Sequence, residues 1–467
     1  MAQNRRKPAV TAVPGRKTLL TGWGRTAPTR ALLLSPESEE QIEAILNARP
    51  ERGVIARGLG RSYGDPAQNA GGAVIDMNDL DRVLAFDSQR GTVRAEAGVS
   101  LDRLMRLFVP AGYFVPVTPG TRYVTIGGAI AADIHGKNHH LDGSFSNHVL
   151  DLELLLPTGE RLHAYPGDDI FQATAGGMGL TGIILNATIQ LIPIETGFVR
   201  VDTERAADLD DVMQKMEDGD AAYRYSVAWV DTIARGRSLG RSVLFRGNHA
   251  TGSDVATFKE GQRRRFAPSP APTMPDLIPG GLINAGTVRA FNEIWFRRHP
   301  VHVRDEIQSL SGYFHQLDMV ENSNRMYGPG GFVQHQSVLP PGAEETLRAM
   351  IETLSSRRCP SFLVVLKRMG PGTGLLSFPM EGWTLAVDIP ARWDGLAAML
   401  DEFDDLVLKA GGRLYLAKDA RMRPEDLAEM YPEIDVWREI VHEADPERVL
   451  QSDQARRLCL HGDGSSE

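Results

Sequence analysis

GTRYVTIGGAIAADIHGKNHH, residues 120–140, is the stretch from which the fold of this chain can be inferred, and residues 56–65, ARGLGRSYGD, precede it with a similar pattern. Both place glycines among hydroxyl, basic and aromatic side chains. Successive backbone N–H groups in a glycine turn can converge on a phosphate, because no Cβ blocks the anion. Residues 176–182, GGMGLTG, add a third glycine turn. The repetition favours a phosphate-bearing cofactor over glycines that only make tight turns.

The type of cofactor site follows from what surrounds these glycines. A G-x-G-x-x-G motif indicates a Rossmann dinucleotide site only when it joins a strand to a helix. Residues 58–65 continue into a turn pattern instead, which argues against that site. His135, His139 and His140 are spaced H-x3-H-H, but no accompanying carboxylates give a zinc-protease pattern. We therefore expect no metal.

Composition limits the function further. A chain of 467 residues exceeds one ordinary core and predicts two domains, and its net charge of -9 gives no basic footprint for nucleic acid. Cys359 and Cys459 predict buried thiols rather than a disulfide framework. Residues 1–17 are expected to be a disordered tail, without a signal peptide. With no apolar run long enough to span a membrane, the expected location is cytoplasmic or membrane-associated, and a periplasmic location is left open.

The chain pattern predicts an α+β protein with short strands. Residues 35–47 form a helix capped by Ser35, and residues 100–109 form another. Strands at 331–339, 362–369 and 383–389 should form one sheet. Gln334 and Gln336 alternate on one strand, and Val365 and Lys367 on the next, so the sheet should present a polar wall to a ligand.

Residues 251–281 are rich in proline, serine and charge, and residues 291–299, FNEIWFRRH, mix aromatic side chains with arginines. One interpretation is a solvated loop anchored by a helix. The alternatives are a lid, or a surface that meets phospholipid and a lipid phosphate.

Four motifs together resemble those of one family. They are LTGWGRTAP at residues 20–28, RGLGRSYGD, PGTRYVTIGGAIAADIHGKNHH, and GGRLYLAKD at residues 411–419. The chain is similar to the decaprenylphosphoryl-β-D-ribose oxidase family, the flavoprotein components of an actinobacterial ribose-to-arabinose 2'-epimerase. The resemblance implies a two-domain vanillyl-alcohol-oxidase/PCMH-type FAD-binding fold with an antiparallel-sheet substrate domain. It divides the chain into an FAD-binding domain at 1–193, a substrate-binding domain at 194–412, and a C-terminal segment at 413–467 that returns to the first domain.

The resemblance also implies site residues. The implied FAD contacts are Ala56, Arg57, Gly58, Leu59, Gly60, Arg61, Ser62, Tyr63, Gly64, Asp65, Pro66, Gly120, Thr125, Ile126, Gly127, Gly128, Ala132, Asp133, Ile134, His135, Ile184 and Tyr415. The implied substrate side consists of Lys137, Trp229, Gln334, Gln336, Lys367, Ala386 and Lys418. Lys418, His135 and Tyr63 are the candidate catalytic residues, with Lys418 at the reacting hydroxyl.

The implied reaction oxidises the ribose 2'-hydroxyl of a polyprenyl-phosphate sugar to a ketone. A separate NADH-dependent keto-reductase would then complete epimerisation for cell-wall arabinan synthesis. Peripheral membrane contact is left open, and no nucleic-acid partner is expected. Two alternatives remain: a soluble sugar-alcohol or aldonolactone oxidase, and a flavin-binding partner protein without catalysis.

Several positions differ from the related patterns. Arg61 stands where related sugar oxidases often have a histidine bonded to the flavin, which predicts noncovalent FAD. Ala386 stands where some family members have a cysteine that nitroaromatic inhibitors modify. Phe314, Val227 and Met369 also differ from the side chains typical of the family.

Overall fold

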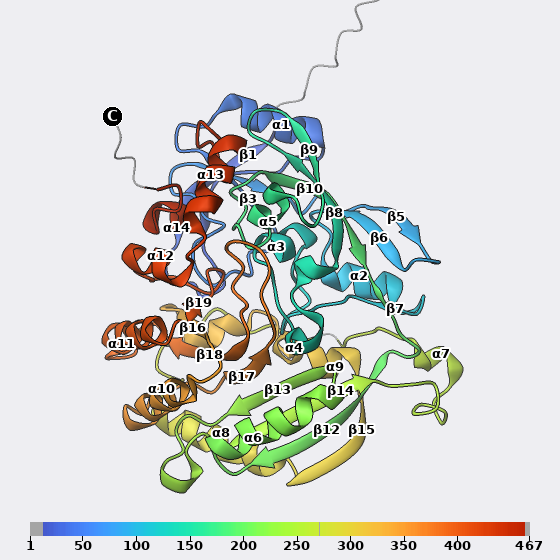
Figure 1. The fold of residues 1–467 in the computed structure, drawn as a ribbon, viewed down its shortest axis with the longest axis vertical. Coiled ribbons are helices and arrows are strands. Elements are labelled where there is room, and N and C mark those ends of the chain that lie inside the picture. The colour runs from blue at the N-terminus through green and yellow to red at the C-terminus, as the bar shows by residue number, and fades with distance from the viewer. Residues whose placement is uncertain (1–12, 270, 463–467) are drawn as a thin grey trace, which may run out of the picture.

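The computed structural model describes residues 13–269 and 271–462, which form two regions arranged along the long axis of the molecule (Figure 1). One region holds a four-stranded and a five-stranded sheet, and the other is built on an eight-stranded sheet. Helices flank these mainly antiparallel sheets instead of alternating with parallel strands. The predicted α+β class is therefore confirmed.

The first glycine loop directly follows β3, which is an edge strand of the four-stranded sheet. Its order is β1-β2-β4-β3, with β2 and β3 both parallel to β4 and β1 antiparallel to β2. The strands are β1 (Gly15–Leu20), β2 (Thr29–Leu34), β3 (Val54–Arg57) and β4 (Ala73–Asp76).

The five-stranded sheet, in the order β5-β6-β10-β8-β9, supports the second glycine-rich stretch. A short pair, β7 (Tyr113–Phe114) and β11 (Ile192–Pro193), lies apart from it. The strands are β5 (Val83–Asp87), β6 (Thr92–Glu96), β8 (Val149–Leu155), β9 (Arg161–Ala164) and β10 (Ile183–Gln190).

The eight-stranded sheet is antiparallel throughout, in the order β15-β12-β14-β13-β17-β18-β16-β19. The three strands expected to form one sheet are neighbours here, because β18 pairs with both β17 and β16. The strands are β12 (Phe198–Ala206), β13 (Tyr225–Val230), β14 (Ser242–His249), β15 (His302–Ser309), β16 (Phe332–Leu339), β17 (Val364–Met369), β18 (Gly382–Pro390) and β19 (Arg413–Leu414).

Helix α2 (Leu101–Phe108) illustrates how the sequence specifies its elements. Ser100 caps it by accepting a hydrogen bond from the Arg103 N–H at 3.2 Å, and its apolar side chains recur at helical spacing and are buried. The other α-helices are α1 (Glu39–Ala48), α3 (Ile126–Ala131), α4 (His139–Asp142), α5 (Asp169–Thr174), α6 (Leu209–Gly219), α7 (Glu260–Arg263), α8 (Ala285–Arg298), α9 (Leu310–Phe314), α10 (Glu344–Ser356), α11 (Leu396–Lys409), α12 (Leu427–Met430), α13 (Ile434–Ala444) and α14 (Asp453–Arg457). Short 3-10 turns are η1 (Phe145–His148), η2 (Asp220–Ala222), η3 (Gly236–Ser238), η4 (Gln316–Met319), η5 (Ser323–Tyr327) and η6 (Pro424–Asp426).

Two sequence-based expectations need correction. The expected tail at residues 1–17 is wrong over residues 15–17, which lie in β1 and pair with β2; residues 1–12 lie outside the described residues. Helix α1 is capped by Ser38 rather than Ser35, because the Ser38 hydroxyl accepts from the Gln41 N–H and the Gln41 side chain accepts from the Glu37 N–H.

The C-terminal segment returns to the first region, where α13 packs against α5 (Figure 1). The Tyr63 N–H donates to the Ala417 carbonyl at 2.9 Å, and the Gln451 N–H donates to the Val54 carbonyl at 2.9 Å. Strand β19 belongs to the eight-stranded sheet, so that sheet extends past residue 412. The division into 1–193, 194–412 and 413–467 stays a prediction. Within the described ranges, no helix combines the length and apolarity needed to cross a membrane.

Candidate functional site

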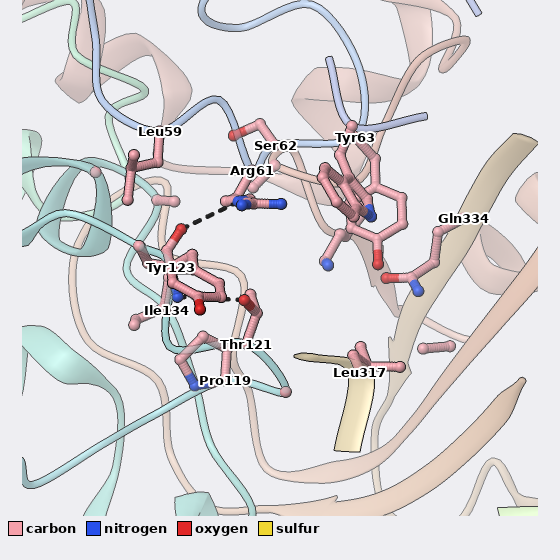
Figure 2. Close-up of a pocket in the computed structure, with 18 of the residues that line it drawn as sticks. Leu59, Arg61, Ser62, Tyr63, Pro119, Thr121, Tyr123, Ile134, Leu317 and Gln334 are labelled. Carbon is pink, nitrogen blue, oxygen red and sulfur yellow. Dashed lines mark hydrogen bonds between the residues drawn. The ribbon is translucent and has the colours of Figure 1, made fainter. Parts of the chain in front are cut away.

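A cavity of about 730 Å³ lies between the glycine-rich loops and the polar face of the eight-stranded sheet. Figure 2 shows Arg61, Ser62 and Tyr63 on the first loop and Gln334 on the strand that faces it. Every site residue expected from the sequence lines this cavity except Gly64, Asp65, Ile126 and Asp133. The cavity thus unites residues from both regions and from the C-terminal segment.

The four exceptions lie behind the cavity wall and hold the loops that carry lining residues. A Cβ on Gly64 would lie 1.9 Å from the Asp419 carbonyl oxygen, so the chain passes there only as glycine. Asp65 accepts a hydrogen bond from Arg457 at 2.8 Å. Ile126 is fully buried, and the Asp133 carboxylate accepts from the Ser144 hydroxyl at 2.7 Å.

The first glycine loop follows β3 and presents unpaired donors. Among the described residues, the backbone N–H groups of residues 58–62 donate to no other protein group. Gly60 has φ +64°, a left-handed conformation that favours glycine. A Cβ on Gly58 would lie 2.2 Å from Thr125 Oγ1, so glycine is also needed where this loop contacts the second one. A run of free donors of this kind can bind an anion.

The second glycine-rich stretch has a different role. Residues 126–131, expected to be part of a loop, form α3, and Thr125 caps it by accepting from the Gly128 N–H at 3.2 Å. The Ile126 and Gly127 N–H groups donate to the Val99 and Ala97 carbonyls. The free donors are therefore concentrated in the first loop, and α3 supplies a close-packed wall.

Arg61 extends from the first loop towards the second. Its guanidinium lies over the Trp23 ring, 4.2 Å from the centroid, and its Nε donates to the Tyr123 carbonyl at 3.2 Å (Figure 2). Burial lowers the pKa of Arg61, while Asp318 acts in the opposite direction. Arginine remains protonated in proteins, so Arg61 contributes a fixed positive charge.

His135 lies where the loops and the sheet meet. Gln336 Nε2 is 2.9 Å from His135 Nε2, and Lys367 Nζ is 3.0 Å from His135 Nδ1. Burial, reinforced by the positive charge of Lys367, holds the pKa of His135 well below its ordinary value. A neutral imidazole has a single acceptor nitrogen, so His135 can accept from one of these two groups, and it adds no charge to the site.

Three half-buried lysines line the same cavity. Burial lowers the pKa of both Lys137 and Lys367 to about 7 and that of Lys418 to about 8. Lys137 Nζ donates to the Tyr313 carbonyl, and Lys418 Nζ lies 3.7 Å from the centroid of the Tyr63 ring. Each amine can change protonation near neutral pH, which suits both anion binding and proton transfer.

Asp388 is a site residue that the sequence reasoning missed. It lies on β18 opposite Gln334 of β16, lines the cavity and is 3% exposed. Gln334 Nε2 donates to its Oδ1, and the Tyr327 hydroxyl donates to its Oδ2 at 3.4 Å. The signal was available, because the two-residue alternation that places Ala386 on the wall also places Asp388 there.

Other predicted wall positions are located as follows. Val227, Phe314 and Ala386 line the cavity, whereas Met369 does not. Trp229 also lines it, and its Nε1 donates to the Phe362 carbonyl at 2.9 Å. No group of three or more potential ligands among the described His, Cys, Asp and Glu residues could hold a metal ion.

Comparison with known proteins adds a chemical identity to this geometry. Residues 30–165 match a family described as FAD binding domain, and residues 391–458 match one described as D-arabinono-1,4-lactone oxidase. The chain is 46% identical over 460 residues to decaprenylphosphoryl-beta-D-ribose oxidase of Mycolicibacterium smegmatis, covering 97% of this chain and all of that protein. It is 24% identical over 439 residues to L-gulono-1,4-lactone dehydrogenase of Mycobacterium tuberculosis, covering 91% and 95%.

These findings show an FAD-binding protein of the vanillyl-alcohol-oxidase/PCMH fold class, as the sequence predicted. The residues present fit FAD, because the free N–H groups of residues 58–62 match a pyrophosphate and the adjoining wall is built of small side chains. The chain is an FAD-dependent oxidoreductase.

Proposed function

Because this chain belongs to the decaprenylphosphoryl-β-D-ribose oxidase family, we propose that it oxidises the ribose 2'-hydroxyl of decaprenylphosphoryl-β-D-ribose to the 2'-ketone. The observation that carries the proposal is one cavity lined by three half-buried lysines, His135 and the two glutamines, directly across from the donor-rich first loop. A phosphate-bearing sugar needs cationic groups for its phosphate and hydrogen-bonding partners for its hydroxyl groups. The side chains of this wall supply both.

We assign the FAD pyrophosphate to the free N–H groups of residues 58–62. The other predicted cofactor residues on the cavity wall, from Ala56 to Tyr415, would line the rest of the cofactor. Arg61 stands at the position of the linking histidine, and an arginine side chain forms no flavin bond, so the cofactor is held noncovalently. Acid precipitation should therefore release all the yellow colour into the supernatant; colour in the pellet would contradict this assignment.

Bound FAD supplies a two-electron acceptor for the carbon that carries the hydroxyl. Lys418, with a pKa of about 8, accepts the hydroxyl proton in its neutral form. Gln336 and His135 orient the sugar, and Lys137 and Lys367 contribute positive charge for its phosphate. Tyr63 lies under the Lys418 amine and restricts its position.

The 2'-ketone requires a reductive second step to yield the arabinose epimer. We propose that a separate NADH-dependent keto-reductase carries out that step. The epimer would then serve cell-wall arabinan synthesis.

A lipid-linked substrate also requires access from a membrane, and we propose that α8 and the segment before it provide the contact. Leu277 is 93% exposed and Ile294 is 69% exposed, while Phe291 of the same helix lines the cavity. Arg289 and Arg298 are exposed on α8 and suit an anionic lipid surface. Leu277→Ser with Ile294→Ser should weaken cosedimentation with phosphatidylglycerol vesicles. Leu19→Ser, at a residue 61% exposed on β1, should not.

The deciding experiment is anaerobic mixing of the yellow holoenzyme with a prenylphosphoryl ribose, and separately with free ribose. We expect the lipid-linked sugar to bleach the flavin and free ribose to do so far more slowly. Equal bleaching by both would favour a sugar or aldonolactone oxidase, and bleaching by neither would favour a flavin-binding partner protein.

Lys418→Ala tests the assignment of the proton acceptor. It should abolish bleaching while FAD stays bound. Lys409→Ala changes an exposed lysine at the end of α11 and should leave bleaching unchanged. Normal bleaching by Lys418→Ala would remove this residue from the mechanism.

A further inference from the structure

The acidic side chains on the cavity wall are not equivalent. Asp318 accepts from the Arg122 backbone N–H at 2.9 Å and from its guanidinium at 3.1 Å. Glu321 accepts from the Thr273 hydroxyl at 2.7 Å and lies at the exposed rim. Asp388 is buried on the sheet face and, among the described residues, forms no ion pair within salt-bridge distance. It is therefore the acidic group of the inner wall that is not neutralised by direct contact with a cation.

The Asp388 carboxylate accepts one hydrogen bond at each of its two oxygens and keeps further acceptor positions unused. Gln334 donates to one carboxylate oxygen and Tyr327 donates to the other. A carboxylate has about four acceptor positions, so part of its capacity is left open beside the cavity. Gln334 is held with its amide nitrogen towards Asp388, and the same amide forms a side-chain hydrogen bond with the Tyr63 hydroxyl at the cavity wall.

The charges around Asp388 are nearly all positive. Lys418, Lys367 and Lys137 line the same cavity, and His135 is neutral. The nearby hydroxyl groups belong to Tyr63, beneath Lys418, and Tyr327, which stacks on Phe332. Of these groups, only Asp388 can carry the negative charge that balances a protonated Lys418. Burial raises the pKa of Asp388 to about 7, and the charge of Lys418 counteracts this shift.

We propose that Asp388 is a positioning residue of the reaction, which orients Gln334 towards the sugar and stabilises the ammonium form of Lys418 after the hydroxyl proton arrives. The catalytic part of this inference, the role of Asp388 in the reaction, rests on the proposed function. The electrostatic link between Asp388 and Lys418 does not depend on the substrate, and it can be measured alone.

Acetic anhydride labelling of the holoenzyme at a series of pH values, followed by peptide mass spectrometry, reports the pKa of Lys418 without substrate. Asp388→Asn keeps the shape of the side chain and removes its charge, so the labelling midpoint of Lys418 should fall by about one pH unit, as expected when a nearby opposite charge is lost. Lys409 in the same samples is the control and should keep its midpoint. An unchanged Lys418 midpoint would overturn the proposal.

Two further variants separate charge from packing. Tyr327→Phe removes a hydrogen bond to Asp388 but keeps the carboxylate, so the midpoint should stay much nearer the wild-type value; an equal shift in both variants would overturn the proposal. If Asp388→Asn does not fold, Asp388→Leu removes the same charge with an apolar side chain of similar size. The same fall in midpoint is expected.

The bleaching reaction then tests the catalytic part. Its rate with prenylphosphoryl ribose should depend on neutral Lys418, so the acidic limb of the pH profile should move to lower pH in Asp388→Asn. A limb that stays in place while the labelling midpoint moves would refute the catalytic role. If wild-type enzyme is not bleached at any pH, the proposed function fails, whereas the labelling midpoint still decides the link between Asp388 and Lys418.

Discussion

Gly58→Ala tests the contact between the two glycine-rich stretches. The new Cβ would lie 2.2 Å from Thr125 Oγ1 and 3.0 Å from Thr125 Cγ2, so the threonine must rotate. Rotation would break the hydrogen bond by which Thr125 caps α3. Loss of a cap costs about 1 kcal/mol, and overpacking of a close contact adds roughly 1–3 kcal/mol. We expect a total of roughly 2–4 kcal/mol.

A double-mutant cycle makes this prediction sharp. Thr125→Ala alone should cost about 1 kcal/mol through the lost cap. The double variant should cost little more than Thr125→Ala alone, because Thr125 Oγ1 and Cγ2, the atoms closest to the new Cβ, are gone, so the coupling should be close to the whole cost of Gly58→Ala. Urea unfolding followed by circular dichroism, at one fixed excess of FAD, measures all four proteins.

Gly261→Ala is the control for a glycine that has no close neighbours. Gly261→Ala places a Cβ where no atom lies within 4 Å, and it should change the free energy of unfolding little. If the costs of Gly58→Ala and Thr125→Ala simply add, the two residues do not share the contact, and this account of Gly58 is wrong.

Three further predictions concern other parts of the molecule. Burial lowers the pKa of His139 to about 3, below its value in the unfolded chain. The neutral imidazole therefore contributes stability above pH 6.5, and this contribution is lost as the pH falls. In urea titrations, His139→Gln should reduce the loss of unfolding free energy between pH 7 and pH 5 by roughly 2 kcal/mol. Arg457 contacts Asp65 and Asp419, each at 2.8 Å, so Arg457→Met should lower the free energy of unfolding by about 3 kcal/mol, whereas an unchanged urea midpoint would show that the pairs contribute nothing. Ala386→Cys should introduce a thiol that iodoacetamide labels in the holoenzyme and that substrate protects, as read by mass spectrometry, with equal labelling in both states as the contrary result.

The sequence predicted the sheet wall because strand periodicity is a local property. Alternation placed Gln334, Gln336 and Lys367 correctly on one surface, and no knowledge of strand order was needed. The pairing of β16 with β18 brings Asp388 to Gln334, and that partner lies 54 residues away along the chain. A sequence pattern specifies the face of a strand, but it does not specify which strand lies alongside.

Helix α3 was not predicted from the sequence, because two of its residues are glycines. Gly127 and Gly128 have poor helix propensity, so the local sequence predicts a turn. The structure needs Gly127 because an added Cβ would lie 3.0 Å from the Ala97 side chain. Tertiary packing therefore outweighs propensity, and the glycines allow a close approach rather than a flexible loop. The choice of Ser38 over Ser35 as the cap likewise depends on where the first helical turn begins, because the Ser38 hydroxyl accepts from the Gln41 N–H.

The return of the C-terminal segment has a consequence for how the protein is made. Tyr63 is held by Ala417, Gly64 packs on Asp419, and Asp65 pairs with Arg457, so the first loop is separated from its supports by more than 350 residues of chain. During synthesis, that loop leaves the ribosome long before any of these supports exist. Contacts of such high sequence separation form slowly, and exposed partial folds aggregate. The cofactor cavity should therefore be completed last, and a chain that stops before residue 457 should accumulate as an aggregation-prone intermediate rather than as a shortened enzyme.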